Sequence, residues 1–375
     1  MSLDALPQTR AVLEQGRADG LHHGVQLFVQ YRGEILCDAA TGEARPGEPL
    51  TADHLMLWLS AGKPVTAAAI VKLCDGRGGQ PYPKIALDDP VTRHLPEFGK
   101  GNGERRRITV RHLLTHTAGL PNADPAYPEV DWDESVRRIC DAPLEDDWIV
   151  GRTAGYHPKS SWFLLGEIVN RVTGEPMIAW IERALLSPAC LEGLRFQFAA
   201  EELESLRQRL APMYRRQGRE LVDAEMSTDA HLTRTSPGSS LRATARNVGD
   251  FYAAIDESRA YCDFPLFSET AAEAMTARHR VGEFDRTLGH VVDFGLGVIV
   301  DSNRYGADTV PYGFGPHCSP RTFGHGGSQS SMAFCDPEND LVVAWATNGM
   351  CGEPKHQRRN RAINAAIYED LGLAG

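Results

Sequence analysis

The residues with the clearest chemical potential are Ser60 and Lys63, which stand three positions apart in the tetrapeptide SAGK. A run of apolar residues follows, with Pro64 where a first helical turn tolerates proline, so both side chains are expected on one helical face. A serine hydroxyl is a weak nucleophile until a neighbour removes its proton, and a desolvated lysine can do so. The same spacing also suits an N-cap serine followed by a surface lysine. The pair therefore predicts a nucleophile and its base only if other residues support it.

A second candidate is Tyr156, in the Gly/Pro-rich segment GYHP at residues 155–158. A phenol at this position can pass a proton between a nucleophile and a leaving group. The alternative is a buried structural tyrosine. A catalytic role for Tyr156 is supported only if the fold brings its side chain close to Ser60.

The third candidate is a glycine-rich segment that contains His325, Gly326, Gly327 and Ser328. Glycines allow a ligand to approach the backbone closely. The N–H groups of Ser60 and Ser328 are therefore predicted to form an oxyanion hole. Taken alone, the segment is also typical of an ordinary tight turn.

Strand signals occur near both ends of the chain. Residues 25–31 and 34–40 flank the dipeptide RG and predict a β-hairpin. Further strands are predicted at residues 294–300, 331–335 and 341–347. The sheet is therefore expected to pair strands from the two ends.

Helical patterns fill the middle of the chain, among long proline-rich loops. Helices are predicted at residues 64–74, 109–115 and 162–173, with an amphipathic helix near the start and a closing helix at 359–371. This order predicts an α+β fold in which an antiparallel sheet is flanked by helices and a mostly helical domain is inserted. Residues 1–75 and 235–375 would form the sheet domain, residues 76–234 the helical domain, and the active site would lie at their junction.

The three candidate motifs, in this order, resemble the β-lactamase and penicillin-binding-protein superfamily, and within it the class C-like (family VIII-type) carboxylesterases. Four other stretches, at residues 108–120, 163–174, 240–251 and 334–348, look similar to these enzymes, and the likeness covers roughly residues 24–371. The resemblance implies a two-part fold, acylation of Ser60, and deacylation by water or another acceptor. It also implies Lys63 and Tyr156 as general bases and the N–H groups of Ser60 and Ser328 as oxyanion donors.

Two positions depart from the pattern of that superfamily. Many members have Tyr-x-Asn, whereas Pro158 here has no side-chain amide to hold an acylamide. Penicillin-recognising enzymes open the third motif with lysine, whereas His325 is largely neutral at pH 7 unless perturbed. Both changes favour esters over β-lactams and peptides.

Long irregular segments at residues 121–153 and 214–240 are expected to form walls or a lid of the site. The side chains predicted as possible pocket residues are those of Trp132, Trp148, Trp162, Tyr214 and His157. Ordinary core packing is the alternative for each aromatic residue.

No metal or cofactor is expected. His112 and His116 are four residues apart, but the metal-binding motif H-E-x-x-H is absent. The sequence also lacks the G-x-S-x-G elbow of α/β-hydrolases.

The composition narrows the choice of partners. A net charge of -11 opposes binding to nucleic acid, and no apolar segment is long enough to span a membrane. Eight cysteines without a dense framework predict reduced thiols and a cytoplasmic location. A small ester or acyl donor is the expected partner, and the oligomeric state stays open.

These observations favour a serine carboxylesterase that works through an acyl-enzyme on Ser60. An acyltransferase of a biosynthetic pathway is the main alternative, and a β-lactamase or D-amino-acid peptidase is the next. A non-catalytic scaffold that kept the fold and lost the chemistry belongs to a different class, and retention of Ser60, Lys63 and Tyr156 argues against it.

Overall fold

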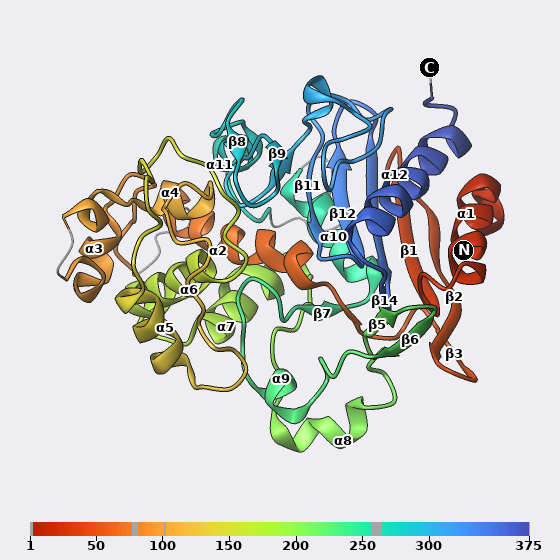
Figure 1. Ribbon diagram of the computed structural model, residues 1–375, viewed down its shortest axis with the longest axis horizontal. Coiled ribbons are helices and arrows are strands. Elements are labelled where there is room, and N and C mark those ends of the chain that lie inside the picture. Colours follow the sequence, from red (N-terminus) through yellow and green to blue (C-terminus); the bar gives the residue numbers. More distant parts are fainter. Residues whose placement is uncertain (1–2, 77–81, 101–102, 257–264, 375) are drawn as a thin grey trace.

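The computed structural model describes residues 3–76, 82–100, 103–256 and 265–374, and its largest sheet has seven described strands (Figure 1). The strands are β1 (Gly24–Tyr31), β2 (Glu34–Arg45), β3 (Glu48–Pro49), β10 (Ile299–Val300), β11 (Phe323–Gly327), β12 (Ser331–Asp336) and β13 (Leu341–Thr347). Their order is β10-β11-β12-β13-β1-β2-β3, and every pairing is antiparallel. The first and last parts of the chain therefore share one sheet, as the sequence predicted.

Both faces of the central strands are buried. Along β13, Val343 and Trp345 join the hydrophobic cluster under α1 (Pro7–Ala18) and α12 (Glu353–Asp370). Val342 and Ala344 point the other way, into the cluster that includes α10 (Ala245–Ile255) and the helical body. Strands buried on both faces appear in sequence as nearly continuous apolar runs, and residues 341–347 have this pattern.

The two chain ends are tied together beside the sheet, where α1 and α12 lie next to each other (Figure 1). Asp370 accepts hydrogen bonds from the backbone N–H groups of Gln8 (3.0 Å) and Thr9 (2.8 Å) and from the Thr9 hydroxyl (2.8 Å). These N–H groups open α1 and have no partner within the helix. A carboxylate from the last helix thus satisfies the first turn of the first helix.

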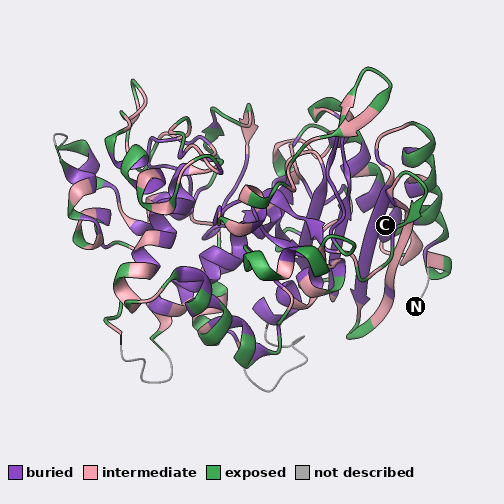
Figure 2. Ribbon diagram, turned by 90° about the horizontal axis from the view of Figure 1, so that it is seen from below, coloured by how far each residue is buried: buried purple, intermediate pink, exposed green. Residues whose placement is uncertain are grey.

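The helical body is built around α2 (Lys63–Asp75) and α6 (Ser160–Thr173). Nearly every side of α2 is buried, and Figure 2 shows buried segments running through the centre of the molecule. The remaining helices are α3 (Val91–His94), α4 (Val110–Leu114), α5 (Trp132–Asp141), α7 (Met177–Trp180), α8 (Leu203–Leu206), α9 (Asp229–Thr233) and α11 (Glu269–Thr276). The short strands are β4 (Met56–Leu57), β5 (Tyr214–Gln217), β6 (Glu220–Asp223), β7 (Arg242–Ala243), β8 (Phe284–Asp285), β9 (His290–Val291) and β14 (Gly349–Met350).

The structure confirms the predicted α+β class, the N-terminal hairpin and the helices at residues 64–74, 109–115 and 162–173. The closing helix begins earlier than predicted, at Glu353, because Pro354 is accommodated in its first turn. The division into residues 1–75 with 235–375 and 76–234 stays a prediction.

One strand prediction was wrong in part, and one hairpin was not predicted. Only residues 299–300 of the predicted strand 294–300 belong to a strand, because Gly295 and Gly297 bend the segment over α2. Gly297 has φ +73°, and a β-carbon there would lie 2.4 Å from Ala67. The hairpin of β5 and β6 was missed because its polar, half-exposed strands depend on pairing with the distant β14.

Cys190 is disulfide-bonded, which corrects the prediction of reduced thiols throughout. Free thiols are present at Cys37, Cys74, Cys140, Cys318 and Cys351. Since disulfides are uncommon in a reducing cytosol, the cytoplasmic location loses one of its supports and stays a prediction.

Among the helices of the described residues, none is both long enough and apolar enough to cross a membrane.

Close packing of α10 on the sheet predicts a large effect of a single methyl group at Gly249. A β-carbon there would lie 2.2 Å from Cδ1 of Phe28. We expect Gly249→Ala to lower the free energy of unfolding by about 1–3 kcal/mol through overpacking, as measured by denaturant unfolding. Gly103→Ala is the matched control, because no described atom outside its chain neighbours lies within 4 Å of its added β-carbon. Equal effects of the two substitutions would contradict the packing argument.

Candidate active site

Ser60 lies in a 3-10 turn (Leu59–Gly62) that runs directly into α2, as the sequence predicted. The preceding Leu59 has φ +50°, a left-handed conformation that costs about 1–3 kcal/mol for a residue with a bulky side chain. Trp58 holds this strained segment through its N–H, which donates to Leu241 O (2.9 Å), and its indole N–H, which donates to Ala243 O (3.0 Å). The nucleophile candidate is therefore presented on a fixed backbone.

The Lys63 side chain reaches back to Ser60 from the first turn of α2. Its Nζ donates to the backbone carbonyls of Pro158 (2.9 Å) and Gly238 (2.7 Å) and lies within hydrogen-bonding distance of Ser60 Oγ (2.8 Å). Lys63 is fully buried and has no carboxylate partner among the described ion pairs. Burial therefore holds the pKa of Lys63 well below its usual value, which favours the neutral amine that can accept a proton.

Tyr156 lies on the loop before α6, and the fold brings it to the same place. Its ring centroid lies 5.2 Å from Lys63 Nζ, and its phenol oxygen is buried without a hydrogen-bond partner of good geometry. Burial raises the pKa of the phenol, and the nearby Ser60 hydroxyl lowers it by a smaller amount. The phenol is thus protonated at neutral pH and has an unused donor and acceptor.

The backbone of Tyr156 is held by a buried ion pair. Asp285 Oδ1 accepts from Tyr156 N (2.9 Å), and Asp285 Oδ2 lies 3.0 Å from Nη2 of Arg280, at angles outside those of a good hydrogen bond. Arg280 also stacks on Phe294, with its guanidinium carbon 4.2 Å from the ring centroid. The ion pair of Arg280 and Asp285 thus holds the backbone of Tyr156 in place.

The glycine-rich segment forms β11 and its turn into β12, with Ser328 in the turn. Gly327 packs directly on the segment before the nucleophile, since a β-carbon there would lie 2.2 Å from Trp58 O. Ser331 Oγ donates to the same carbonyl (2.9 Å). Among the described hydrogen bonds, the N–H groups of Ser60 and Ser328 have no acceptor, so both are available to a ligand.

His325 stands at the position of a lysine in penicillin-recognising relatives, and the structure makes it neutral. Its Nδ1 donates to Gly326 O (2.8 Å), so Nε2 carries no proton, and Nε2 is buried without a partner. Burial lowers the pKa of the ring to about 3. This segment therefore offers a substrate no cation.

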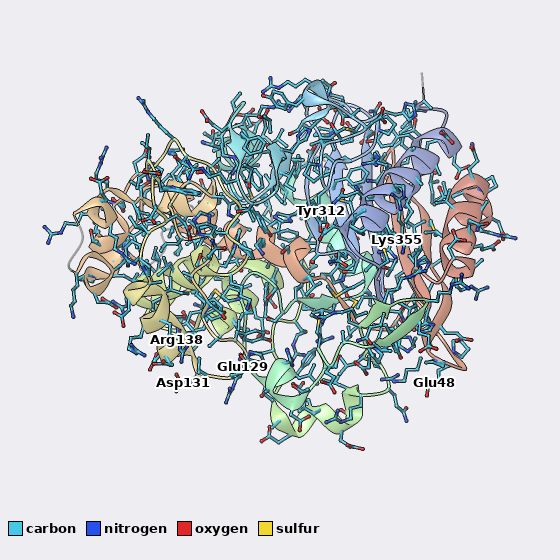
Figure 3. The ribbon with its side chains drawn as sticks, viewed as in Figure 1. Glu48, Glu129, Asp131, Arg138, Tyr312 and Lys355 are labelled. Atoms are coloured by element: carbon cyan, nitrogen blue, oxygen red, sulfur yellow. The ribbon has the colours of Figure 1, made fainter. Side chains whose placement is uncertain are left out.

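Two cavities meet at Ser60. The larger, of about 510 Å³, is lined by Tyr156, His325 and Tyr312, which is labelled in Figure 3. The smaller, of about 260 Å³, is lined by residues that include Tyr127, Met226, His231 and Arg242. Both cavities include Ser60, Pro158 and Ser328 in their walls. An ester centred on Ser60 could thus place its two halves in separate spaces.

Neither cavity is lined by any of the five side chains predicted as possible pocket residues, which corrects that prediction. Trp162 is buried behind Lys63, with its ring 5.3 Å from Nζ. Trp148 packs on Gly119 and Gly155. Tyr214 contacts His23, with ring centroids 4.6 Å apart.

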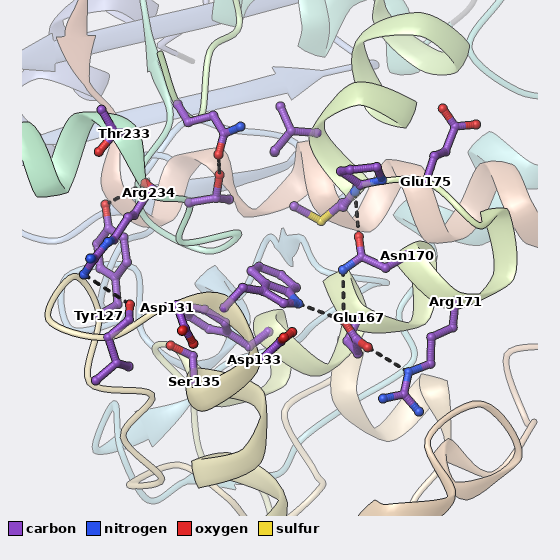
Figure 4. A pocket seen from close by; sticks show the side chains of 18 of the residues that line it. Tyr127, Asp131, Asp133, Ser135, Glu167, Asn170, Arg171, Glu175, Thr233 and Arg234 are labelled. Atoms are coloured by element: carbon purple, nitrogen blue, oxygen red, sulfur yellow. Dashed lines mark hydrogen bonds and ion pairs between the residues drawn. The ribbon is translucent and has the colours of Figure 1, made fainter. Parts of the chain in front are cut away.

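The other two predicted pocket residues also have structural roles. His157 Nε2 accepts from Leu120 N (2.8 Å), and burial lowers the pKa of this histidine to about 3. Trp132 lines a separate cavity of about 680 Å³ between α5, α6 and α7, where its indole N–H donates to Glu167 (2.7 Å; Figure 4). The aromatic side chains that were predicted to line the active-site pocket therefore pack within the fold instead.

Sequence reasoning missed Tyr312, Leu288, Tyr127 and Arg242 as cavity residues, because none belongs to a local motif. It did indicate the loops: Tyr127 comes from the segment 121–153, and Met226 from the segment 214–240. The two loops are far apart in the sequence, and the fold brings them together at the smaller cavity.

The described residues contain no group of three His, Cys, Asp or Glu side chains arranged to hold a metal ion. His112 Nδ1 instead accepts from Thr109 N (3.2 Å) at the start of α4. His116 Nδ1 accepts from His157 N (3.0 Å) behind the site. Both histidines therefore position the backbone.

The ion pair behind Tyr156 predicts that neutralising Asp285 destabilises the fold. Both side chains of the pair are at most 2% exposed. We expect Asp285→Asn to lower the free energy of unfolding by about 3–5 kcal/mol, because Arg280 stays charged and buried. Asp38→Asn is the control, since its ion pair with Arg246 is longer (3.4 Å) and more exposed, and its loss should cost below about 1 kcal/mol. Similar losses in calorimetry would show that Asp285 is not a buried counter-ion.

Known proteins share sequence and fold with this chain. The chain is 32% identical to esterase EstB of Burkholderia gladioli over 218 residues, which is 51% of this chain and 52% of EstB. The chain thus spans about half the length of this relative. A penicillin-binding-protein homologue from Caulobacter crescentus superposes with a TM-score of 0.75 at 26% identity, over 99% of each chain. A family VIII carboxylesterase superposes with a TM-score of 0.76 at 23% identity, again over 99% of each chain, and this likeness shows the fold alone.

The profile of the beta-lactamase family matches residues 9–367. This match includes Ser60, Lys63, Tyr156 and the turn at Ser328. With the antiparallel sheet, the flanking helices and the convergence of these residues, the chain belongs to the beta-lactamase family of serine hydrolases.

Proposed function

We propose that this protein is a serine carboxylesterase that acts on small or medium esters through a Ser60 acyl-enzyme. The observation that carries the proposal is the 2.8 Å contact between Ser60 Oγ and a buried lysine that lacks a carboxylate partner. Lys63 in its neutral form can accept the hydroxyl proton as Ser60 Oγ attacks the ester carbonyl.

The leaving alcohol needs a proton, and Tyr156 is placed to supply it. Its protonated phenol borders the larger cavity and has no hydrogen-bond partner of good geometry among the described residues. Tyr156 donates its proton to the departing oxygen and regains one from Lys63, so the two residues form a relay. In deacylation the same groups deprotonate water, and the acid is released from Ser60.

The oxyanion of the tetrahedral intermediate would be held by the free N–H groups of Ser60 and Ser328. The turn at Ser328 is fixed against Trp58 by Gly327 and Ser331. Donors that are already oriented stabilise the developing charge without reorganisation.

An ester is favoured over an amide or a β-lactam by two features of the walls. Pro158 offers a carbonyl to Lys63 but no side-chain amide to a substrate. The neutral His325 offers no cation where related enzymes have lysine. Turnover of a chromogenic cephalosporin as fast as that of an ester would contradict this preference.

The acyl-enzyme predicts a burst of product from p-nitrophenyl acetate before steady state, equal to about one equivalent of enzyme if deacylation is slow. Ser60→Ala should remove both burst and turnover, leaving a rate at least about 1000-fold lower. Ser205→Ala, at an exposed helical serine whose hydroxyl donates to Glu202 O, is the matched control and should keep the burst. Equal rates in the Ser60→Ala variant and the parent would refute the proposed nucleophile.

The lowered pKa of Lys63 predicts how activity depends on pH. Below that pKa the amine is protonated and cannot accept the Ser60 proton, so kcat/KM should rise with pH and level off well below pH 10.5, the ordinary pKa of lysine. Burial raises the pKa of Tyr156, so the phenol should cause no fall in activity over the same range. Lys63→Arg should be inactive at every pH, because a guanidinium does not deprotonate. A profile that is unchanged in Lys63→Arg would exclude Lys63 as the base.

A further inference from the structure

The smaller cavity at Ser60 has a positively charged wall. Arg242 and Lys159 line it, and none of its lining residues is acidic. Lys159 is 42% exposed and pairs with Asp124 (3.2 Å), so its charge is already matched. The charge of Arg242 is the one that needs an explanation.

Arg242 is 2% exposed and has no counter-ion among the described residues. Its Nη2 donates to Met226 O (2.5 Å) and to Ser227 Oγ (3.3 Å), and both acceptors are neutral. Its Nη1 is buried without any partner. Burial lowers the pKa of the guanidinium to about 10, so the group still carries its charge at neutral pH.

The backbone of Arg242 is fixed beside the cavity. In β7 it lies opposite Leu57, in the strand that leads to Ser60. Its N–H and carbonyl are both bonded to Arg195, at 2.7 and 3.0 Å. A buried, unpaired charge is costly, and a carboxylate in the cavity would relieve that cost by accepting from the unpartnered Nη1.

The position of Tyr156 indicates which half of the ester enters this cavity. Tyr156 lines the larger cavity and is absent from the walls of the smaller one. Because the leaving oxygen must lie near the proton donor, the alcohol belongs in the larger cavity and the acyl group in the smaller. The volume of about 260 Å³ suits a short acyl chain.

Building on the esterase function proposed above, we propose that Arg242 binds a carboxylate at the far end of the acyl group, so that the substrates are short half-esters of dicarboxylic acids. Ser60 Oγ bonds to the ester carbon, the carbon–alkoxide bond breaks, and the Ser60 proton reaches the alcohol through Lys63 and Tyr156. Water then cleaves the acyl-enzyme, and the dicarboxylate leaves.

The experiment compares monomethyl glutarate with methyl pentanoate, which has the same chain length without the second carboxylate. Hydrolysis is followed in a pH-stat, with the uncatalysed rate subtracted. We expect the parent enzyme to hydrolyse the half-ester with a kcat/KM at least about tenfold higher, as one charge-assisted contact implies. In Arg242→Gln this ratio should fall to about one, and Arg242→Lys should restore part of it.

Arg216→Gln is the matched control. Its described hydrogen bonds likewise go to neutral oxygen atoms, the carbonyls of Gly218, Asp19 and Gly20, but it lies outside both cavities. It should keep the preference for the half-ester. A purely structural role of Arg242 would lower both rates equally and leave the ratio unchanged, which would overturn the proposal.

If Arg242→Gln does not fold, inhibition of the parent enzyme by carboxylic acids tests the carboxylate site in its place. Glutarate should compete with methyl pentanoate at a concentration at least about tenfold lower than butyrate does. Equal inhibition by the two acids, or equal turnover of the two esters, would overturn the carboxylate site and leave the esterase intact. Loss of hydrolysis of both esters, with no difference from Ser60→Ala, would instead overturn the esterase itself.

Discussion

The site depends on one constraint, a lysine amine kept out of water and unpaired with any carboxylate of the described residues. Lys63 is bonded to Ser60, and to two backbone carbonyls that lie 95 and 175 residues further along the chain. An acidic neighbour would stabilise the ammonium form and remove the base. The start of α2, the loop before α6 and the turn at residues 236–240 must therefore converge, and the rings of Tyr156 and Trp162 close the space around the amine.

Burial sets the protonation state of the whole cluster and not of Lys63 alone. It keeps the phenol of Tyr156 protonated and the rings of His116, His157 and His325 neutral. The full charges directly behind Tyr156 are those of the ion pair of Arg280 and Asp285. Proton transfer within this cluster therefore takes place among neutral groups.

Burial lowers the pKa of both Lys63 and Arg242, but it leaves the two side chains in different charge states. An amine loses its proton when it is desolvated, which turns Lys63 into a base. A guanidinium resists deprotonation, so Arg242 keeps its charge and an unsatisfied N–H group. One side of Ser60 is thus adapted to proton transfer and the other to holding an anion.

The sequence by itself determined the parts whose physics is local. The spacing of Ser60 and Lys63 fixes them on one turn, and the continuous apolar run at residues 341–347 specifies a buried strand. Tertiary structure alone decided the walls of the site, since burial and pairing depend on segments far apart in the chain. It placed Trp148, Trp162 and Tyr214 in the packing, bent the predicted strand 294–300 over α2, and paired β5 with β14. It also left Arg242 without a counter-ion, because whether a charge is paired is decided by what the fold places around it.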